Sequence, residues 1–308
     1  MTAGHTPARP GATRPFGDHL RHWREQRRLS QLDLASHADI STRHLSFVET
    51  GRSLPSREMV LRLAERLAVP LRERNALLVA AGYAPMYRER ALDDPASAAA
   101  REAVDLILRS HEPFPALAID RHWNLLAANA MLAPLLDGVD PALLQPPVNV
   151  LRLSLHPLGL AARIVNLTQW RQHLFERLRE QIAHTADPML VALLDELRAY
   201  PAHDATDAEP LPGEHRGIAI PLRLQTPRGV LTFISTTTVF GTAVDVTLQE
   251  LALETFLPAD AFTGGRLRKL AAGLSATAHT DAGIAPTPST AAAHDHAQFT
   301  PASTKGTA

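Results

Sequence analysis

Residues 30–53, SQLDLASHADISTRHLSFVETGRS, contain two short helical patterns separated by a four-residue connector. Ser30 and Ser41 stand just before the two patterns, where a side-chain hydroxyl caps the first backbone N–H groups of a helix. In the second pattern Leu45 and Val48 are three residues apart, so they share one helix face and leave the polar residues outward. The stretch therefore predicts two adjacent helices, the second with a polar outer face.

Helical spacing continues on both sides of this stretch, from residue 16 to residue 81. Asp33 completes a capping-box pattern with Ser30, and Ser56 occupies a further N-cap position. Gly51 and Gly82 follow helix ends, where glycine adopts the left-handed conformation readily. We predict an all-α domain over residues 16–84, with helices at residues 16–28, 31–38, 42–49, 57–67 and 71–81.

The polar face of the 42–49 helix fits a nucleic-acid partner. An α-helix enters the major groove of B-DNA, where Arg43 can pair with guanine and Thr42 or Phe47 can touch a thymine methyl. Gln31 opens the preceding helix and is placed for a phosphate contact. Residues 1–90 hold 15 arginines and 9 acidic residues, whereas the remainder is acidic. The residues expected to contact double-stranded DNA are Gln31, Ser41, Thr42, Arg43, His44, Ser46, Phe47 and Arg52; packing of Phe47 against the fourth helix remains an alternative.

The stretch from Phe16 to about Gly82 resembles the Xre/Cro-type, lambda-repressor-like helix-turn-helix family. The resemblance implies that Gln31 meets phosphate and that Thr42, Arg43 and Phe47 read bases. It also implies a pair between Arg24 on the first helix and Glu49 at the end of the recognition helix. The family usually has glycine in the turn where this chain has Asp39, a residue type that tolerates the left-handed conformation better than most.

The rest of the chain predicts a second, α+β domain over residues 103–270, after a connector at 85–102. FPALAIDRHWNLLAAN (114–129) suggests two strands, residues 129–199 are mainly helical, and IAIPLRLQTPRGVLTFISTTTVFG (218–241) suggests a hairpin. VTLQELALETFLP (246–258) suggests a third strand segment. This order predicts an antiparallel sheet with helices on one face. Residues 1–15 and 271–308 are expected to be disordered tails.

Several longer strings resemble the MmyB-like transcription regulators. They are PPVNVLRLSLHPLGLAARIVNLTQW (146–170), DELRAYP (195–201) and STTTVFGTAVDVTLQELALETFLPAD (235–260), together with RHLSFVETGRS (43–53) and LLVAAGYAP (77–85). The resemblance implies a PAS-like C-terminal domain that binds fatty-acid-like or other small apolar molecules. The implied function is a transcription regulator that senses such a ligand.

Polar residues set sparsely among apolar ones mark a candidate ligand pocket, and an arginine among them suits a carboxylate head group. Arg163, Asn166 and Trp170 have the spacing of one helix face, which could instead pack on the sheet or on another subunit. Both readings stay open from the sequence. The candidate ligand residues are Asn149, Arg152, His156, Arg163, Asn166, Trp170 and Thr236.

The sequence lacks the motifs typical of catalytic and cofactor sites. The sequence has no cysteine, no G-x-S-x-G, no H-E-x-x-H and no glycine-rich phosphate loop, so we expect neither an enzyme, a cofactor nor a metal site. His294 and His296 form an H-x-H, too few ligands for a structural metal site. The rival functions are a DNA-tethered enzyme and a repressor whose larger domain binds a partner protein.

The sequence has no apolar run of about 18 residues and no secretory signal, so we expect a cytoplasmic protein without membrane contact. One short recognition helix reads few base pairs, and two half-sites about one helical turn apart are therefore expected. That geometry predicts a homodimer.

Overall fold

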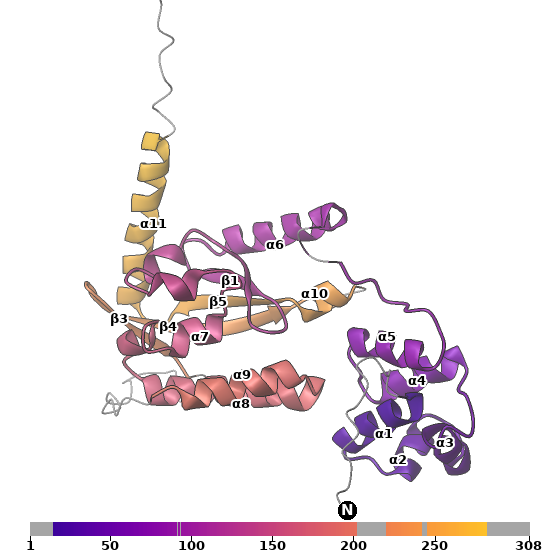
Figure 1. The fold of residues 1–308 in the computed structure, drawn as a ribbon. Helices are drawn as coiled ribbons and strands as arrows, with labels where there is room; N and C mark the ends of the chain where they lie inside the picture. Colours follow the sequence, from indigo (N-terminus) through magenta and orange to yellow (C-terminus); the bar gives the residue numbers. More distant parts are fainter. Residues whose placement is uncertain (1–14, 91, 93, 202–219, 242–244, 282–308) are drawn as a thin grey trace, which may run out of the picture.

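The computed structural model describes residues 15–90, 92, 94–201, 220–241 and 245–281, with side chains as far as residue 274. It contains a helical N-terminal domain beside a larger domain built on a sheet (Figure 1). The predicted N-terminal tail up to residue 14, and residues 282–308 of the predicted C-terminal tail with His294 and His296, lie outside the described residues.

The N-terminal domain has the five predicted helices. They are α1 (Phe16–Gln26), α2 (Gln31–His37), α3 (Thr42–Glu49), α4 (Arg57–Arg66) and α5 (Leu71–Ala80). Ser30 caps α2 through a complete capping box with Asp33, and the hydroxyls of Ser41 and Ser56 cap α3 and α4. Asp39 adopts the left-handed conformation expected in the turn, with φ 54°. Local sequence signals therefore set the starts of α2, α3 and α4.

The core of this domain brings α1 directly against the end of α3. Leu20, Trp23 and Leu45 are among its fully buried side chains. At Gly17 a Cβ atom would lie 2.2 Å from the carbonyl oxygen of Glu49. Only glycine permits this approach, because the neighbouring atom belongs to the backbone and cannot turn aside.

The C-terminal domain is α+β, as predicted, with a five-stranded antiparallel sheet in the order β2-β1-β5-β4-β3. Its strands are β1 (Ala116–Ile119), β2 (Leu125–Ala128), β3 (Leu222–Thr226), β4 (Gly229–Val239) and β5 (Ala252–Pro258). Its helices are α6 (Ala98–Ser110), α7 (Val150–Leu155), α8 (Leu167–Thr185), α9 (Pro188–Ala199), α10 (Val246–Glu250) and α11 (Ala261–Asp281). Short 3-10 turns occur at Pro95–Ser97, Ala133–Leu135, Pro141–Leu144 and Ala161–Arg163.

The sequence predicted both hairpins, β1–β2 and β3–β4, but only half of the third strand segment. Residues 246–250 form α10, and the strand β5 begins at Ala252. The side chain of Asp245 accepts hydrogen bonds from the backbone N–H groups of Thr247 and Leu248, which starts a helix where apolar alternation suggested a strand.

Helices cover both faces of the sheet. In β1, Leu117 and Ile119 point into a large core shared with α7, α8 and α9, whereas Ala116 and Ala118 face a smaller core under α6. Figure 1 shows α8 and α9 on one side of the sheet and α6 on the other. The sequence predicted helices on one face of the sheet, and the structure adds α6 on the other face. Helix α6 starts at Ala98, inside the predicted connector.

Helix α11 corrects the predicted boundary of the C-terminal tail. It continues to Asp281, eleven residues into the stretch expected to be disordered. Leu267 is fully buried, and Leu270, Ala271 and Leu274 pack against the large core. These four residues are spaced i, i+3, i+4 and i+7, so one apolar helix face persists although the composition of the tail is low in aromatics. Among the described residues, no helix is long and apolar enough to span a membrane.

Candidate DNA interface and ligand cavity

The outer face of α3 carries an aromatic ring flanked by two arginines. The guanidinium carbons of Arg43 and Arg52 lie 5.4 and 6.0 Å from the centre of the Phe47 ring. Phe47 is partly exposed and lies outside the hydrophobic core of the domain. These cation–π contacts hold the charges of Arg43, on α3, and Arg52, just after it, beside one apolar ring. The arrangement favours the outward reading of Phe47 over packing against α4.

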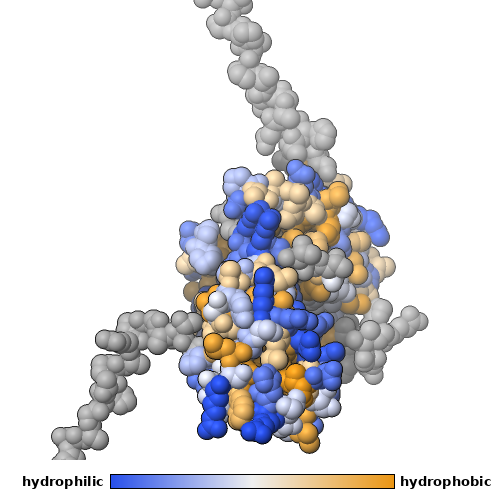
Figure 2. All heavy atoms as spheres, turned by 90° about the vertical axis from the view of Figure 1, so that its right-hand side faces the viewer, coloured by the Kyte–Doolittle hydropathy of each residue, from blue (hydrophilic) through white to orange (hydrophobic). Residues whose placement is uncertain are grey.

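The other candidate DNA residues surround this cluster. Ser41 accepts a hydrogen bond from the backbone N–H of His44 at 3.1 Å, so its hydroxyl shapes the start of α3. Thr42, His44 and Ser46 are partly exposed on the same helix. Helix α3 lies on the side of the N-terminal domain turned away from the sheet (Figure 1). Figure 2 views the molecule from the side of this domain, where hydrophilic side chains alternate with smaller apolar areas.

The side chain of Gln31 makes a contact within the domain that the sequence did not predict. Its Nε2 donates to Glu49 Oε2 at 2.8 Å, and the side chain of Glu49 is fully buried. Arg24 donates to the same carboxylate at 2.7 and 3.1 Å, which confirms the pair implied by the family resemblance. Burial by itself raises the pKa of Glu49, but the hydrogen bonds from Arg24 and Gln31 and the charges of Arg24 and Arg21 outweigh it and lower that pKa.

The C-terminal domain contains an apolar cavity of about 90 Å³ between the sheet and helices α7 and α8. Its wall consists mainly of leucines and aromatic rings, including Leu151, Trp170, Leu222 and Phe233. The lining residues with polar side-chain groups besides the two tryptophans are Ser154, Arg177 and Glu254. A small apolar space with a few orienting polar groups is the usual composition of a ligand pocket.

The polar side of the cavity is an ion pair between two elements. Arg177 on α8 donates to Glu254 on β5, with Nη2–Oε1 at 2.6 Å and Nη1–Oε2 at 3.3 Å. Thr237 on β4 also donates to Oε1 of Glu254 and accepts from Arg177. The guanidinium carbon of Arg177 lies 4.8 Å from the centre of the Trp123 ring. Strands β4 and β5, helix α8 and the turn between β1 and β2 thus meet at the guanidinium of Arg177.

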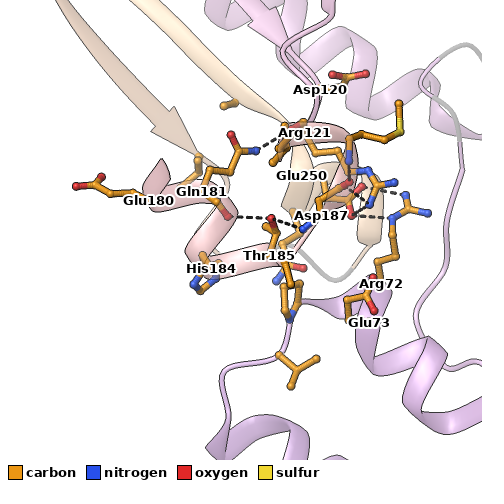
Figure 3. A pocket seen from close by; sticks show the side chains of 18 of the residues that line it. Arg72, Glu73, Asp120, Arg121, Glu180, Gln181, His184, Thr185, Asp187 and Glu250 are labelled. Atoms are coloured by element: carbon orange, nitrogen blue, oxygen red, sulfur yellow. Dashed lines mark hydrogen bonds and ion pairs between the residues drawn. The ribbon is translucent and has the colours of Figure 1, made fainter. Parts of the chain in front are cut away.

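A second, larger space of about 1070 Å³ lies between the two domains. Figure 3 shows charged side chains projecting into it from both sides, with Arg72 and Glu73 on α5 facing Arg121, Asp187 and Glu250 of the C-terminal domain. Trp123, Arg177 and Glu254 line this cleft as well as the apolar cavity.

Direct contacts close the cleft at one edge. Arg72 makes a bidentate pair with Glu250 of α10 at 2.8 and 2.9 Å, and Leu71 N donates to Gln249 Oε1 at 2.8 Å. Thr247 exchanges hydrogen bonds with the backbone of Arg90. The DNA-binding candidate domain is thereby joined to the helix that leads directly into β5.

A second set of contacts joins α1 to the end of α8. Gln26 Nε2 donates to the carbonyl of Ala183 at 3.0 Å, and Arg27 donates to the carbonyls of Ala183 and His184. These acceptors are terminal carbonyls of a helix, which attract positive charge. Burial lowers the pKa of His184, and the charge of Arg27 lowers it further.

Of the seven candidate ligand residues, Trp170 lines the apolar cavity and the other six do not. Arg152 forms a bidentate pair with Glu196 at 2.7 and 2.8 Å and has 42% of its side chain exposed. His156 packs edge-on against the Tyr200 ring, 5.0 Å between centres. Asn149 caps α7 and donates to the carbonyl of His122. Each of these three side chains contacts a residue that is distant in the sequence, so the local sequence carries no sign of the contact.

The predicted common helix face of Arg163, Asn166 and Trp170 does not form. Arg163 ends a 3-10 turn, and Asn166 precedes α8 as its N-cap residue. Asn166 is buried and bonds the backbone of Pro221 and Arg223, which fixes it to the start of β3. Arg163 donates to the carbonyls of Asp137 and Gln225. Thr236 hydrogen-bonds the hydroxyl of Thr255 across β4 and β5.

Arg177 lines the apolar cavity but is absent from the residues that the sequence suggested for a ligand pocket. It follows Trp170 by seven residues and Leu174 by three, so the three side chains share one face of α8. A single arginine on the apolar face of a helix was the signal available in the sequence. Its partner Glu254 is 77 residues away in the sequence, so the ion pair could not be predicted from local spacing.

Two family models match the chain. The MmyB-like transcription regulator ligand binding domain matches residues 100–270, and a helix-turn-helix domain matches residues 15–77. No curated protein matches the chain significantly. Since the first match covers more than half of the sequence, the chain belongs to the MmyB-like transcription regulators and joins a helix-turn-helix DNA-binding domain to the ligand-binding domain of that family.

Proposed function

We propose that this regulator binds an operator as a homodimer, with α3 in the major groove, and that a small apolar ligand in the C-terminal cavity changes its operator affinity. The cluster of Arg43 and Phe47 on α3 with Arg52 just after the helix carries the DNA part of the proposal. Arginine and an apolar ring side by side suit a guanine next to a thymine. Two copies are needed because one helix of eight residues reaches few bases.

The ligand part rests on the apolar cavity beside Trp170. About 90 Å³ is less than the 150 Å³ of an engineered protein cavity that holds benzene, so a compact apolar group suits the present shape. A fatty-acid-like ligand, as the family resemblance implied, requires its chain to displace part of the leucine wall. The matched regulator domains support sensing over catalysis, and we propose a cytoplasmic location because a regulator must reach DNA.

We assign DNA binding to residues 16–84 and ligand sensing to residues 103–270, with α6 extending the second domain to Ala98. Native mass spectrometry of the purified chain tests assembly and ligand together. We expect a dimer, with any retained small molecule adding its mass. A stoichiometric partner protein would instead favour a repressor that acts through protein binding.

Operator binding is tested by selecting sequences from a random duplex library and titrating the best one by fluorescence anisotropy. We expect affinity for the selected duplex to exceed affinity for a scrambled duplex by at least about 10³-fold, the lower range for specific binding. Equal affinity for the two duplexes would contradict sequence-specific recognition.

A further inference from the structure

The apolar cavity and the interdomain cleft share one wall. Trp123, Arg177 and Glu254 line both spaces, so a molecule that fills the cavity has a charged group between itself and the other domain. Trp123 is held in the left-handed conformation, with φ 67°, which is unusual for an aromatic residue. Such backbone strain occurs preferentially at functional sites.

Arg177 has hydrogen-bonding capacity left at this wall. A guanidinium carries five N–H groups, of which three here donate to Glu254 and Thr237. Among the described residues, the remaining two make no hydrogen bond. Arg177 keeps about a quarter of its side chain exposed, whereas Glu254 is almost fully buried. The arginine can therefore donate to a further acceptor without giving up its partner.

The other arginines proposed for a head group are less suitable. Arg152 is paired with Glu196 on the surface and lines neither space, and Arg163 donates to two backbone carbonyls. Ser154 lines the cavity, but its hydroxyl oxygen already accepts a hydrogen bond from the Trp170 indole. Within the part of the chain that the structure describes, Arg177 is thus the cationic group that borders the apolar cavity.

We propose that Arg177 binds the anionic head group of an amphipathic ligand, whose apolar part fills the cavity and whose head lies at the wall facing the interdomain cleft. This inference rests on the proposed sensing function and specifies the ligand's charge and orientation. A head group there lies beside β5, which follows directly on α10 and its contacts with Leu71 and Arg72. Ligand and DNA-binding domain then meet at the same cleft.

The test compares hexanoate with 1-hexanol, two probes with the same chain and different head groups. Binding to the full-length protein is followed by tryptophan fluorescence, since Trp123 and Trp170 line the cavity. We expect hexanoate to bind at least about tenfold more tightly than 1-hexanol, the ratio that corresponds to one hydrogen bond to a charged group. Arg177→Gln should remove this preference and leave 1-hexanol binding unchanged.

Two further variants fix the assignment. Glu254→Gln should strengthen hexanoate binding, because it removes a like charge beside the head group. This variant tests the position of the head group if Arg177→Gln does not fold. Arg152→Gln is the matched control: it removes an arginine with a carboxylate partner outside the cavity, and it should change neither probe's affinity.

The possible failures are distinct. If both probes bind equally, or if Arg152→Gln abolishes the preference for hexanoate, the Arg177 assignment is overturned while the cavity remains a ligand site. If Glu254→Gln weakens hexanoate binding, the head group lies elsewhere. Binding of neither probe overturns the sensing proposal for this cavity together with the inference, whereas the operator titration tests DNA binding independently.

Discussion

Arg24 and Glu49 form a two-pronged ion pair, 2.7 Å from Nε to Oε1 and 3.1 Å from Nη2 to Oε2, that ties α1 to the last residue of the recognition helix. The carboxylate is fully buried and receives a third hydrogen bond from Gln31. Three helices of the DNA-binding domain therefore meet at one charge. The orientation of α3, and so of its outer face, depends on this contact.

Arg24→Ala should destabilise the DNA-binding domain by about 3–5 kcal/mol, because it removes the hydrogen-bonded cationic partner of a buried carboxylate and leaves Arg21 at 3.7 Å, without a hydrogen bond. The measurement is urea unfolding of the full-length protein followed by circular dichroism. Glu58→Ala serves as the control, since Glu58 pairs with Arg62 on an exposed helix face and such pairs contribute about 0–1 kcal/mol. Similar losses for the two variants would contradict a dominant role for the buried pair.

Acid should weaken the same domain through Glu49. Its pKa lies below the ordinary value of 4.5 in the folded state, so its contribution is complete above pH 4.5 and is lost as pH falls through the folded-state pKa. Burial opposes this shift, and hydrogen bonds from Arg24 and Gln31 overcome it. The stability difference between wild type and Glu49→Gln should therefore shrink below pH 4.5. A difference that stays constant down to pH 2.5 would exclude this linkage.

Gly17→Ala should destabilise the protein by more than about 1–3 kcal/mol, the usual range for overpacking, because the added Cβ meets the Glu49 carbonyl at 2.2 Å. Gly265→Ala is a matched control within α11, where no heavy atom lies within 4 Å of the added Cβ. Alanine at a helical position with open space should stabilise by about 0.5–1 kcal/mol. Thermal unfolding of both variants checks the opposite signs.

The sequence predicted the features that depend on neighbours in the chain. Ser30, Ser41 and Ser56 cap their helices because a cap needs only the next three residues. Asp39 was anticipated in its left-handed turn for a similar reason. The Arg24–Glu49 pair, in contrast, followed from the family resemblance, since spacing alone does not reveal a contact between distant helices.

Six of the seven candidate ligand residues lie away from the apolar cavity, because their polar contacts are with residues distant in the sequence. Arg152 and Glu196 are 44 residues apart, and Asn166 bonds Arg223 57 residues away. Polar residues in an apolar segment have the same appearance in a sequence whether they cap a helix, pin a strand or face a cavity. Trp170 was predicted as a pocket residue on such a pattern, and Arg177, on the same helix face, was omitted.

Base readout should separate Arg43 from Gln31. Arg43→Ala should cost about 1–3 kcal/mol on the selected operator and relax specificity at one position, because a side chain that pairs with a base edge distinguishes sequences. Gln31→Ala should weaken binding to all duplexes alike. It should also lower stability modestly, since Glu49 loses one hydrogen bond. Operator and scrambled-duplex titrations check both; equal losses on the two duplexes for Arg43→Ala would contradict its role.

The contact between the domains should depend on Glu250. This carboxylate receives two hydrogen bonds from Arg72 and lies 3.7 Å from Arg121, so Glu250→Gln removes the charge shared by both arginines. Loss of about 1.4 kcal/mol of docking energy raises the undocked population about tenfold. Because the sequence has no cysteine, spin labels at Ser36→Cys and Asp105→Cys report the distance between the domains without interference.

We expect the distance distribution between these labels to broaden toward longer values in Glu250→Gln and to stay unchanged in Glu58→Gln, whose exposed pair with Arg62 lies within one domain. The same labels then connect docking to sensing. Helix α10, which carries Glu250, leads into β5 and the Glu254 carboxylate at the cavity wall, so hexanoate should shift the wild-type distribution and have a weaker effect after Glu250→Gln. A distribution that is identical in wild type and Glu250→Gln would mean that the Arg72–Glu250 pair does not hold the domains together.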